Sequence, residues 1–361
     1  MREQLQKDFD KTVKTAEISQ EEILIKKDFL NKFIESGFPN KKQEDWKFLD
    51  ISQIIKKDIS NLSFFNDYSQ SNKIDPSIYI DSLDHNKIVF SNGRIEKIDF
   101  SHEDQNKIEI IDDTKKNTSF DNKNPLIDLN SALIHKVFKI LIKKDYSLKK
   151  PLIIYHSTNE KITSTNINLR LDFELGEKSC LKLIDYFAKN RTKNFLNIFY
   201  NFHLEKDSIL KNYKIDKFKN DDLKYSFNNI EQGNNSVSET FIFSAGSNYF
   251  KNEINCNLNG EYSSAFINGI FSLKENQQHE IRSTVNHLVE NTKSYQLIKS
   301  VLGKNSKSAY QGRIFVNSKA QKTDGYQLSK AILLDETSEF NAKPELEIYA
   351  DDVKCSHGSA S

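Results

Sequence analysis

A regular alternation of apolar and polar side chains begins near residue 163. Apolar side chains occupy every second position, at Ile167, Leu169, Leu171, Phe173 and Leu175. Successive side chains of a β-strand point to opposite faces, so this period of two predicts a strand. Further strand-like segments lie at 137–142, 151–155, 181–183, 195–204, 254–258, 265–273 and 313–316. Few convincing long helices separate them, and we therefore predict an all-β body.

The alternation leaves two architectures open. The chain has 361 residues, more than the roughly 250–300 at which one compact core stops growing. A large β-sandwich would fit, and so would a β-helix, which buries one continuous core over many short strands. No clean repeat period separates the two. The sequence holds 11 Gly and 5 Pro, so we expect Asn and Asp to form many of the turns.

The first 60 residues predict helices instead. Ser19 and Glu22 have the spacing of a capping box, and an apolar stripe at helical spacing follows them. Gly37 is the expected helix end. We interpret the segment after it as a turn that anchors a helical cap through Trp46, the single Trp, and Phe48. A strand and an Asn92-Gly93 turn are predicted at 88–95. Segments 60–80 and 101–124 are interpreted as a loop and a surface excursion.

Composition excludes several classes of function. The 52 basic and 51 acidic residues give a net charge of +1, so we expect neither nucleic acid nor a membrane as a partner. Neither an apolar leader nor a run of about 18 apolar residues is present. The three widely spaced cysteines indicate a reducing, cytoplasmic location. Phosphate-binding loops and nucleophile elbows are also absent, so no catalytic residue is predicted.

Cys355 and His357 form the one place where a thiol and an imidazole sit together. In an extended backbone, residues two apart share a face, so both donors would point the same way. The pair suits Zn, Cu, Fe or an iron–sulfur cluster. Such centres usually take four ligands, so the others must come from elsewhere in the chain or from a partner. We predict Cys355 and His357 as metal-binding and cofactor-binding residues.

The remaining cysteines and two further histidines are interpreted as structural. Cys256 shares its expected face with Ile254 and Leu258, and core packing is the default for both Cys256 and Cys180. His279 and His287 lie eight positions apart without a Cys nearby in sequence. They would enter a site only if the fold brings them to Cys355.

Longer motifs resemble those of the SufB/SufD family. The C-terminal ones are GRIFV at 312–316, AQKTDGYQ at 320–327 and KPELEIYADDVKCSHG at 343–358. GFPNKKQEDWKF at 37–48 and LNSA at 129–132 are similar to the N-terminal motifs of that family. The resemblance runs from about residue 20 to 358, and the segment 343–358 is closest to the SufD branch.

The resemblance implies a mainly β fold with a right-handed parallel β-helix core and a helical domain at each end. We expect an N-terminal helical domain over 1–65 and the β-helix core over 66–350. Residues 351–361 would begin a C-terminal region that is truncated, because the sequence stops at Ser361 soon after the motif. The C-terminal helices of the family carry most of the contact with the SufC ATPase.

The resemblance also implies a function and partners. The chain would be a non-catalytic scaffold subunit that pairs with SufB through the β-helix and docks SufC, which would hydrolyse ATP. A nascent iron–sulfur cluster would form transiently at Cys355 and His357, shared with SufB, with none held tightly by the isolated chain. In isolation the chain could instead form a homodimer. Three rival functions remain open: a SufB-like sulfur-accepting subunit, a β-helix enzyme acting on polysaccharide, and a purely structural interaction protein.

Overall fold

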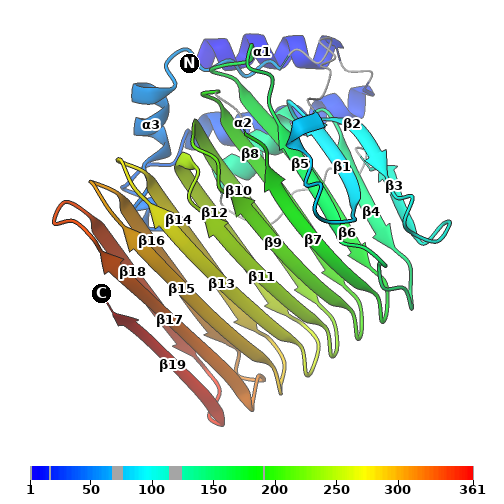
Figure 1. Cartoon of the computed structure of the whole chain (residues 1–361), viewed down its shortest axis with the longest axis vertical. Coiled ribbons are helices and arrows are strands. Elements are labelled where there is room, and N and C mark those ends of the chain that lie inside the picture. Colours follow the sequence, from blue (N-terminus) through cyan, green and yellow to red (C-terminus); the bar gives the residue numbers. More distant parts are fainter. Residues whose placement is uncertain (1, 16–17, 67–75, 114–123, 190–191, 361) are drawn as a thin grey trace.

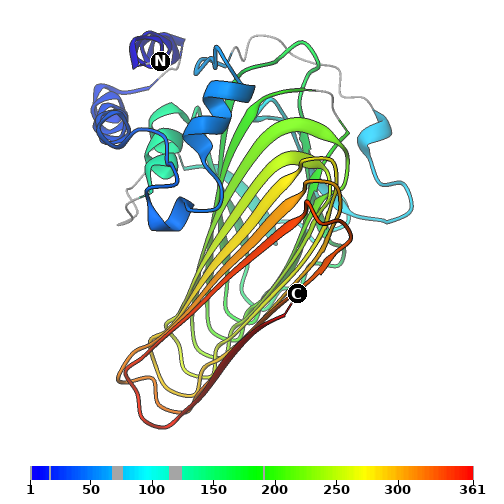
Figure 2. The same cartoon turned by 90° about the vertical axis from the view of Figure 1, so that its left-hand side faces the viewer.

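The strands of this chain wind into a parallel β-solenoid, with helices gathered along one side of it, at the top of Figure 1. The computed structural model describes residues 2–15, 18–66, 76–113, 124–189 and 192–360. Within them, the strands form a ten-stranded sheet and a nine-stranded sheet. Figure 2 shows the coils nearly end on, with the two sheets facing each other. A parallel β-helix is therefore confirmed, and the alternative of a sandwich is wrong.

We call the ten-stranded sheet the front sheet. Its strands, in spatial order, are β19 (Val353–Ala360), β17 (Thr323–Leu333), β15 (Lys293–Leu302), β13 (Ser264–Leu273), β11 (Val237–Ser244), β9 (Ile209–Asp216), β7 (Cys180–Phe187), β5 (Leu152–Ser157), β1 (Asn86–Ser91) and β2 (Arg94–Asp99). β1 and β2 are antiparallel and joined by the predicted Asn92-Gly93 turn, in which both residues have positive φ. That prediction is confirmed.

The nine-stranded sheet is called the back sheet. Its strands are β18 (Glu339–Ile348), β16 (Lys307–Val316), β14 (Gln278–His287), β12 (Ser247–Leu258), β10 (Asn220–Gln232), β8 (Phe195–Leu204), β6 (Asn166–Leu175), β4 (Val137–Ile142) and β3 (Ile108–Asp112). β3 is antiparallel to β4. The surface excursion predicted at 101–124 is therefore wrong where it includes β3. Residues 114–123 of that segment, and 67–75 of the predicted loop, lie outside the described residues.

One corner of the coils repeats along the solenoid. It is formed by residues with positive φ, at Asp145, Lys178, Asp207, Asn235, Tyr262, Asn291 and Lys322. The Asp207 N–H donates to the Asn234 carbonyl of the next coil at 2.9 Å, and the Asn291 N–H donates to Gln321 at the same distance. Asn and Asp fill several of these corners, as predicted, because they tolerate left-handed backbone. The interval is shortest between Asn235 and Tyr262 and longest between Asp145 and Lys178, so no strict sequence repeat appears.

The main hydrophobic core lies between the two sheets. It runs from Ile88 and Ile140 in the first coils to Leu302 and Tyr310 near the last. Cys256, Ile254 and Leu258 belong to it on β12, which confirms their predicted shared face. Removing this much apolar surface from water is the main stabilisation that a solenoid has.

The helices cover the outer face of the back sheet. They are α1 (Arg2–Thr15), α2 (Gln20–Ser36), α3 (Ile51–Asp58) and α4 (Pro125–Leu133), with the short 3-10 helix η1 (Glu44–Trp46). A second 3-10 helix, η2 (Pro76–Ile78), lies against the front sheet instead. The capping box of Ser19 and Glu22 is present, and Gly37 ends α2 with φ 68. Phe29 and Leu30 of α2 share a cluster with Phe199 of β8 and Tyr225 of β10. The helical N-terminal region is thereby confirmed.

Two of the sequence motifs serve this packing. Asn130 on α4 donates through Nδ2 to the carbonyls of Leu169 (3.2 Å) and Asn197 (2.8 Å), which bridges β6 and β8. Trp46 is buried, and the Lys251 ammonium on β12 lies 4.4 Å from the centre of its ring. The same ammonium donates to the Asp45 carbonyl at 2.6 Å. The predicted anchoring role of Trp46 is therefore confirmed. In the part of the chain described, no helix is long and apolar enough to cross a membrane.

Candidate cluster-binding edge

Cys355 and His357 lie on β19, the outermost strand of the front sheet. The strand is extended, so the two side chains share a face, as predicted. β19 pairs in parallel with β17, with Cys355 opposite Gly325 and His357 opposite Gln327. Gly325 and Gln327 are buried positions on the inward face of β17. The thiol and the imidazole therefore occupy the row that faces the interior in the preceding coils.

The two donors are covered to different degrees. Cys355 is partly buried and packs against a small cluster at this end of the solenoid, formed by Ile314, Val316, Ala320 and Ala350. His357 is exposed. Among the described residues, β19 has a paired neighbour on one side only. The side chains of the inward row are therefore buried in the earlier coils, whereas at this edge Cys355 is only partly covered and His357 is exposed.

Burial controls the chemistry of the Cys355 thiol. Desolvation raises its pKa, a hydrogen bond from the Gly325 backbone N–H acts in the opposite direction, and the charge of Asp324 adds to the increase. The missing side chain of Gly325 makes room for the sulfur, since a Cβ there would lie 3.3 Å from Cys355 Sγ. The thiol is therefore held in its neutral form until a cation or metal lowers its pKa.

Small and polar groups lie beside the pair in the preceding coil. The Gln327 side chain donates to the Glu345 carbonyl of β18 at 3.3 Å. Ser329 donates to the Ser359 hydroxyl at 3.1 Å. A thiol and an imidazole beside small polar groups fit soft or borderline metals, including iron with sulfide. Within the described residues, no group of three or more His, Cys, Asp or Glu side chains could hold a metal ion.

The other sequence candidates lie away from this edge. His279 and His287 are buried on β14 of the back sheet. His279 Nε2–H donates to the Ser247 carbonyl at 2.7 Å, and Nδ1 accepts from the Ser244 hydroxyl at 2.9 Å. The fold does not bring either histidine to Cys355, so their structural interpretation stands. The packing assigned to Cys180 is wrong, because Cys180 begins β7 only partly buried, on the face opposite to buried Leu181.

A buried ionic group inside the solenoid gave no sequence signal. Asp185 on β7 accepts from Lys214 Nζ at 2.7 Å and from Tyr200 at 2.9 Å, and it also contacts His156. Desolvation acts to raise the pKa of Asp185, but the charges of Lys214 and His156 outweigh it and lower that pKa. All four side chains are buried, so we interpret the group as structural. The parallel register of the strands brings these four side chains together. A single His in the sequence does not reveal that register.

The N-terminal and C-terminal sequence motifs meet at the back sheet. Lys343 of β18 lies 2.6 Å from Glu44 and 2.6 Å from Glu345. Gln311 of β16 donates to the Asp45 carbonyl at 3.3 Å. The turn at 44–46 is therefore held by the strand that carries the start of the 343–358 motif, in the coil that ends with Cys355 and His357.

Comparison with known proteins identifies the family of the chain. Residues 156–361, more than half of the chain, match the family described as "SUF system FeS cluster assembly, SufBD core domain". The chain belongs to the SufBD family. It is also similar to "Iron-sulfur cluster assembly protein SufD" of Escherichia coli (strain K12), with 25% identity over 339 residues that cover 91% of this chain and 78% of that protein. The SufBD core match includes β19, and the similarity to SufD reaches beyond it into the helical region.

Membership in the SufBD family makes this chain a subunit for FeS cluster assembly. Gly325 and Gln327, the residues beside the donor pair, belong to the motif at 320–327, but nothing in that motif marks them as neighbours of a site. Their place beside Cys355 and His357 depends on the register between β17 and β19, and no local pattern encodes that register.

Proposed function

We propose that this chain is a SufD-like scaffold subunit, and that Cys355 and His357 help to hold a nascent iron–sulfur cluster. One observation carries the proposal. The register of β19 on β17 puts both donors on the inward row of the coil, at a point where the described residues leave that row open. The cluster is the cargo of the assembly reaction, and this chain positions it without catalysing a chemical step.

The donor set supports a site shared between two subunits. A thiolate and an imidazole supply two ligands, whereas iron–sulfur centres usually take four protein ligands. The described residues around Cys355 offer no third His, Cys, Asp or Glu arranged to hold a metal. The remaining ligands would come from a partner whose own donors face this edge, and we propose SufB as that partner.

The exposed strand edges support pairing through the solenoid. In the described part of the chain, β18 and β19 are the outermost strands of the two sheets at this end. Unpaired N–H and C=O groups on an edge strand form a template for a strand from another chain. Pairing there would bury His357 and exclude water from the cluster. We further propose that SufC docks on the assembled complex and supplies ATP hydrolysis, a proposal that rests on family membership.

The test is anaerobic co-purification of this chain with SufB and SufC, followed by iron and sulfide analysis. We expect the three proteins to co-elute with iron and sulfide. The variants Cys355→Ala and His357→Ala should lose most of the cluster while keeping the complex together. The matched control is His203→Ala, an exposed histidine on β8, which should leave the cluster content unchanged. Full cluster content in the His357→Ala complex would exclude the proposed role.

Co-elution also separates the partner proposals from the ligand proposal. Retention of SufB without SufC would support the pairing and exclude SufC docking on this chain. A complex that forms normally but holds no iron in the parent protein would exclude the ligand role of Cys355 and His357. Loss of SufB binding after a Val353→Pro change, which removes a backbone donor from β19, would support pairing through this edge.

A further inference from the structure

The outer face of the front sheet carries a largely apolar surface, which is interrupted by Asn268 on β13 and by the ion pair of Lys211 and Glu239. We call it the aromatic face and define it by the outward side chains Tyr213, Phe241, Phe266, Tyr295, Leu297, Tyr326 and Leu328. Parallel register aligns them in two rows across β9 to β17. The rings of Tyr295 and Tyr326 stack with centroids 5.1 Å apart. A hollow of about 350 Å³ lies between Tyr213, Phe241 and Phe266.

Much of this surface is exposed to solvent. Tyr213 is 37% exposed and Tyr295 is 36% exposed, and the neighbouring Ile270 is 37% exposed. Contiguous exposed apolar surface on a protein usually marks an interaction site. The aromatic face is separate from the inward row that holds Cys355 and His357, because side chains alternate between the two faces of a strand.

The back sheet has a different outer face. Helices cover its first half, and an amide ladder follows, in which Asn255 Nδ2 donates to Asn229 at 2.9 Å and Asn229 Nδ2 donates to Asn201 at 3.0 Å. Those amides satisfy one another and need no partner protein. The two outer faces of one solenoid therefore differ in chemistry, and no described segment covers the apolar one over β9 to β17.

The chain itself shows what covers this kind of surface. At the other end of the front sheet, Ile78, Tyr79 and Ile80, in and after η2, pack on the outer face of β1, β5 and β7. The Ile80 N–H donates to the Tyr155 hydroxyl at 3.1 Å. This cover ends near Ile215 and Phe218, where the aromatic face begins. A short segment with apolar side chains, which leaves the single turn of η2 at Ile78, is thus already the cover for one end of the same sheet.

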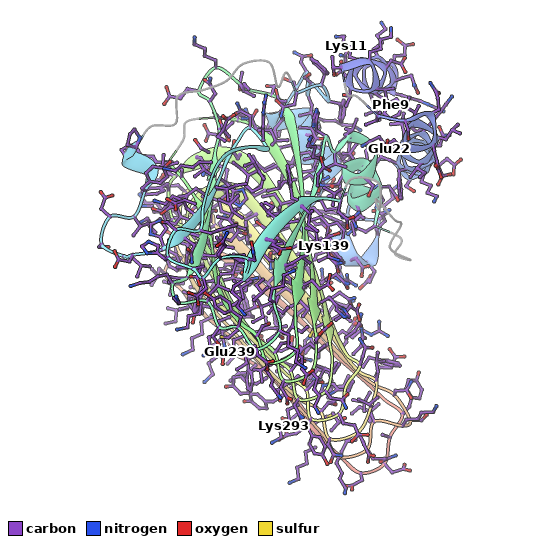
Figure 3. The ribbon with its side chains drawn as sticks, turned by 90° about the vertical axis from the view of Figure 1, so that its right-hand side faces the viewer. Phe9, Lys11, Glu22, Lys139, Glu239 and Lys293 are labelled. Carbon is purple, nitrogen blue, oxygen red and sulfur yellow. The ribbon has the colours of Figure 1, made fainter. Side chains whose placement is uncertain are left out.

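Charge around the aromatic face indicates the partner. Exposed lysines border it at Lys182, Lys293, Lys299, Lys330 and Lys354. The acidic side chains on these outward positions are Glu239, which pairs with Lys211 at 3.2 Å, and Asp324. Figure 3 shows Glu239 and Lys293 on the side of the solenoid away from Phe9 and Glu22 of the helices. We propose that the aromatic face binds an amphipathic α-helix with acidic flanks, contributed by a partner protein.

The dimensions of the face fit such a helix. Five strands from β9 to β17 span four intervals of about 4.8 Å, or about 19 Å. An α-helix rises 1.5 Å per residue, so about 13 residues would cross the face along the solenoid axis. Apolar side chains at i, i+3, i+4 and i+7 would contact the two rows. Glu or Asp beside that stripe would lie next to Lys299 and Lys330.

A designed peptide tests the proposal without knowledge of the natural partner. The probe is a 14-residue helical peptide with Leu and Phe on one stripe and Glu elsewhere, and its counterpart carries Lys in place of Glu. Binding to the full chain is measured by fluorescence anisotropy. We expect the acidic peptide to bind at least about tenfold more tightly than the basic one, and its affinity to fall as salt rises.

Variants locate the binding. Phe241→Ser with Tyr295→Ser should weaken binding of the acidic peptide about tenfold, and so should the exposed charge reversals Lys299→Glu and Lys330→Glu. The matched control is Phe315→Ser with Tyr349→Ser, an aromatic pair formed by β16 of the back sheet and the residue after β18, with centroids 5.8 Å apart. That control should bind like the parent. Circular dichroism melting confirms that each variant is folded.

Three results would overturn the proposal. Equal affinity for the acidic and basic peptides would show that the lysines around the aromatic face do not select an acidic partner. Sedimentation equilibrium that finds a dimer dissociated by Phe241→Ser and Tyr295→Ser would assign the aromatic face to a second copy of the chain. Binding of phosphatidylglycerol vesicles that the same substitutions abolish, without peptide binding, would assign it to a membrane surface. None of these results depends on iron, sulfide or Cys355 and His357.

Discussion

Lys343 Nζ lies 2.6 Å from Glu44 Oε1, an ion pair between β18 and the turn before Trp46. It joins two segments that lie almost at opposite ends of the sequence. The hydrogen bond to Lys343 lowers the pKa of Glu44. Lys251, next to Trp46, makes a second link to the same turn, but it is buried where Lys343 is partly exposed. The two lysines should therefore differ in their effect on stability.

Replacing Lys251 with Ala should destabilise the protein by about 3–5 kcal/mol, because it leaves the buried Glu280 carboxylate without its cation. Lys251 Nζ lies 2.6 Å from Glu280 Oε1. The free energy of unfolding in urea measures the change. The control is Lys343→Ala, which removes two partly exposed ion pairs, with Glu44 and Glu345, and should change stability by less than about 1 kcal/mol. Equal losses of unfolding free energy in Lys251→Ala and Lys343→Ala would contradict the expected difference between the two lysines.

Stability should fall as pH drops from 6.5 towards 4, because two buried histidines resist protonation. Desolvation lowers the pKa of His279 and of His287 to about 4. The unfolded chain binds those protons near pH 6.5, so between the two values it holds more protons than the folded state, and stability rises with pH. The expected loss is on the order of 3 kcal/mol per histidine.

Urea unfolding at a series of pH values measures this slope. In His287→Gln, the slope between pH 6.5 and 4 should be smaller than that of the parent by up to about 1.4 kcal/mol per pH unit, whatever the variant does to stability at pH 7. Exposed His203 supplies the matched control, since His203→Gln should keep the parent slope. An unchanged slope in His287→Gln would mean that His287 is protonated in the folded state.

The three thiols should react at different rates with iodoacetamide. Burial raises the pKa of Cys256 to about 12, and its side chain is inside the core. Cys355 and Cys180 are partly buried, with pKa values raised less. Because the thiolate is the reacting form, we expect Cys355 and Cys180 to be alkylated well before Cys256. Peptide mass spectrometry gives the three rates, and in about 8 M urea, where burial is lost, about equal rates serve as the control.

Two glycines in the turns between strands should respond differently to a methyl group. A Cβ at Gly260 would lie 2.0 Å from the Asn234 backbone nitrogen of the preceding coil, whereas a Cβ at Gly303 would meet nothing closer than 4.0 Å. Gly260→Ala should therefore cost about 3 kcal/mol or more through overlap with backbone. Gly303→Ala should change stability by less than about 0.5 kcal/mol. Differential scanning calorimetry distinguishes the two variants. Similar melting temperatures would show that the backbone at Asn234 can shift to make room for the added Cβ.

Some strands were predictable from the sequence, and others were not. The bounds expected at 137–142 and 195–204 are those of β4 and β8. β10 (Asn220–Gln232) escaped prediction because its pattern is inverted. Tyr225 and Phe227 face outward beneath the helices, while Lys224 and Asn228 are buried on the inward face. An alternation pattern is interpreted on the assumption that the polar side faces water, and that assumption fails under a helical cover.

The donor pair was predictable, but its surroundings were not. Spacing alone placed Cys355 and His357 on one face, given an extended backbone. Their alignment with Gly325 and Gln327 is a property of the β17–β19 register, which pairing over the whole sheet determines. The contact of Lys343 with Glu44 also depends on the complete solenoid, since only the stacking of every coil brings β18 beneath the N-terminal turn.

Among the described residues, the outermost strands at the Cys355 end of the solenoid, β18 and β19, belong to different sheets. A chain that joins this end must therefore offer two strand edges at once, separated by the roughly 10 Å that divides facing sheets. A flat sheet or a stray extended peptide can satisfy one edge and leaves the other unpaired. The end of the solenoid thus discriminates among β-proteins by geometry, favouring another two-sheet coil and disfavouring the single-strand addition through which exposed edges usually aggregate.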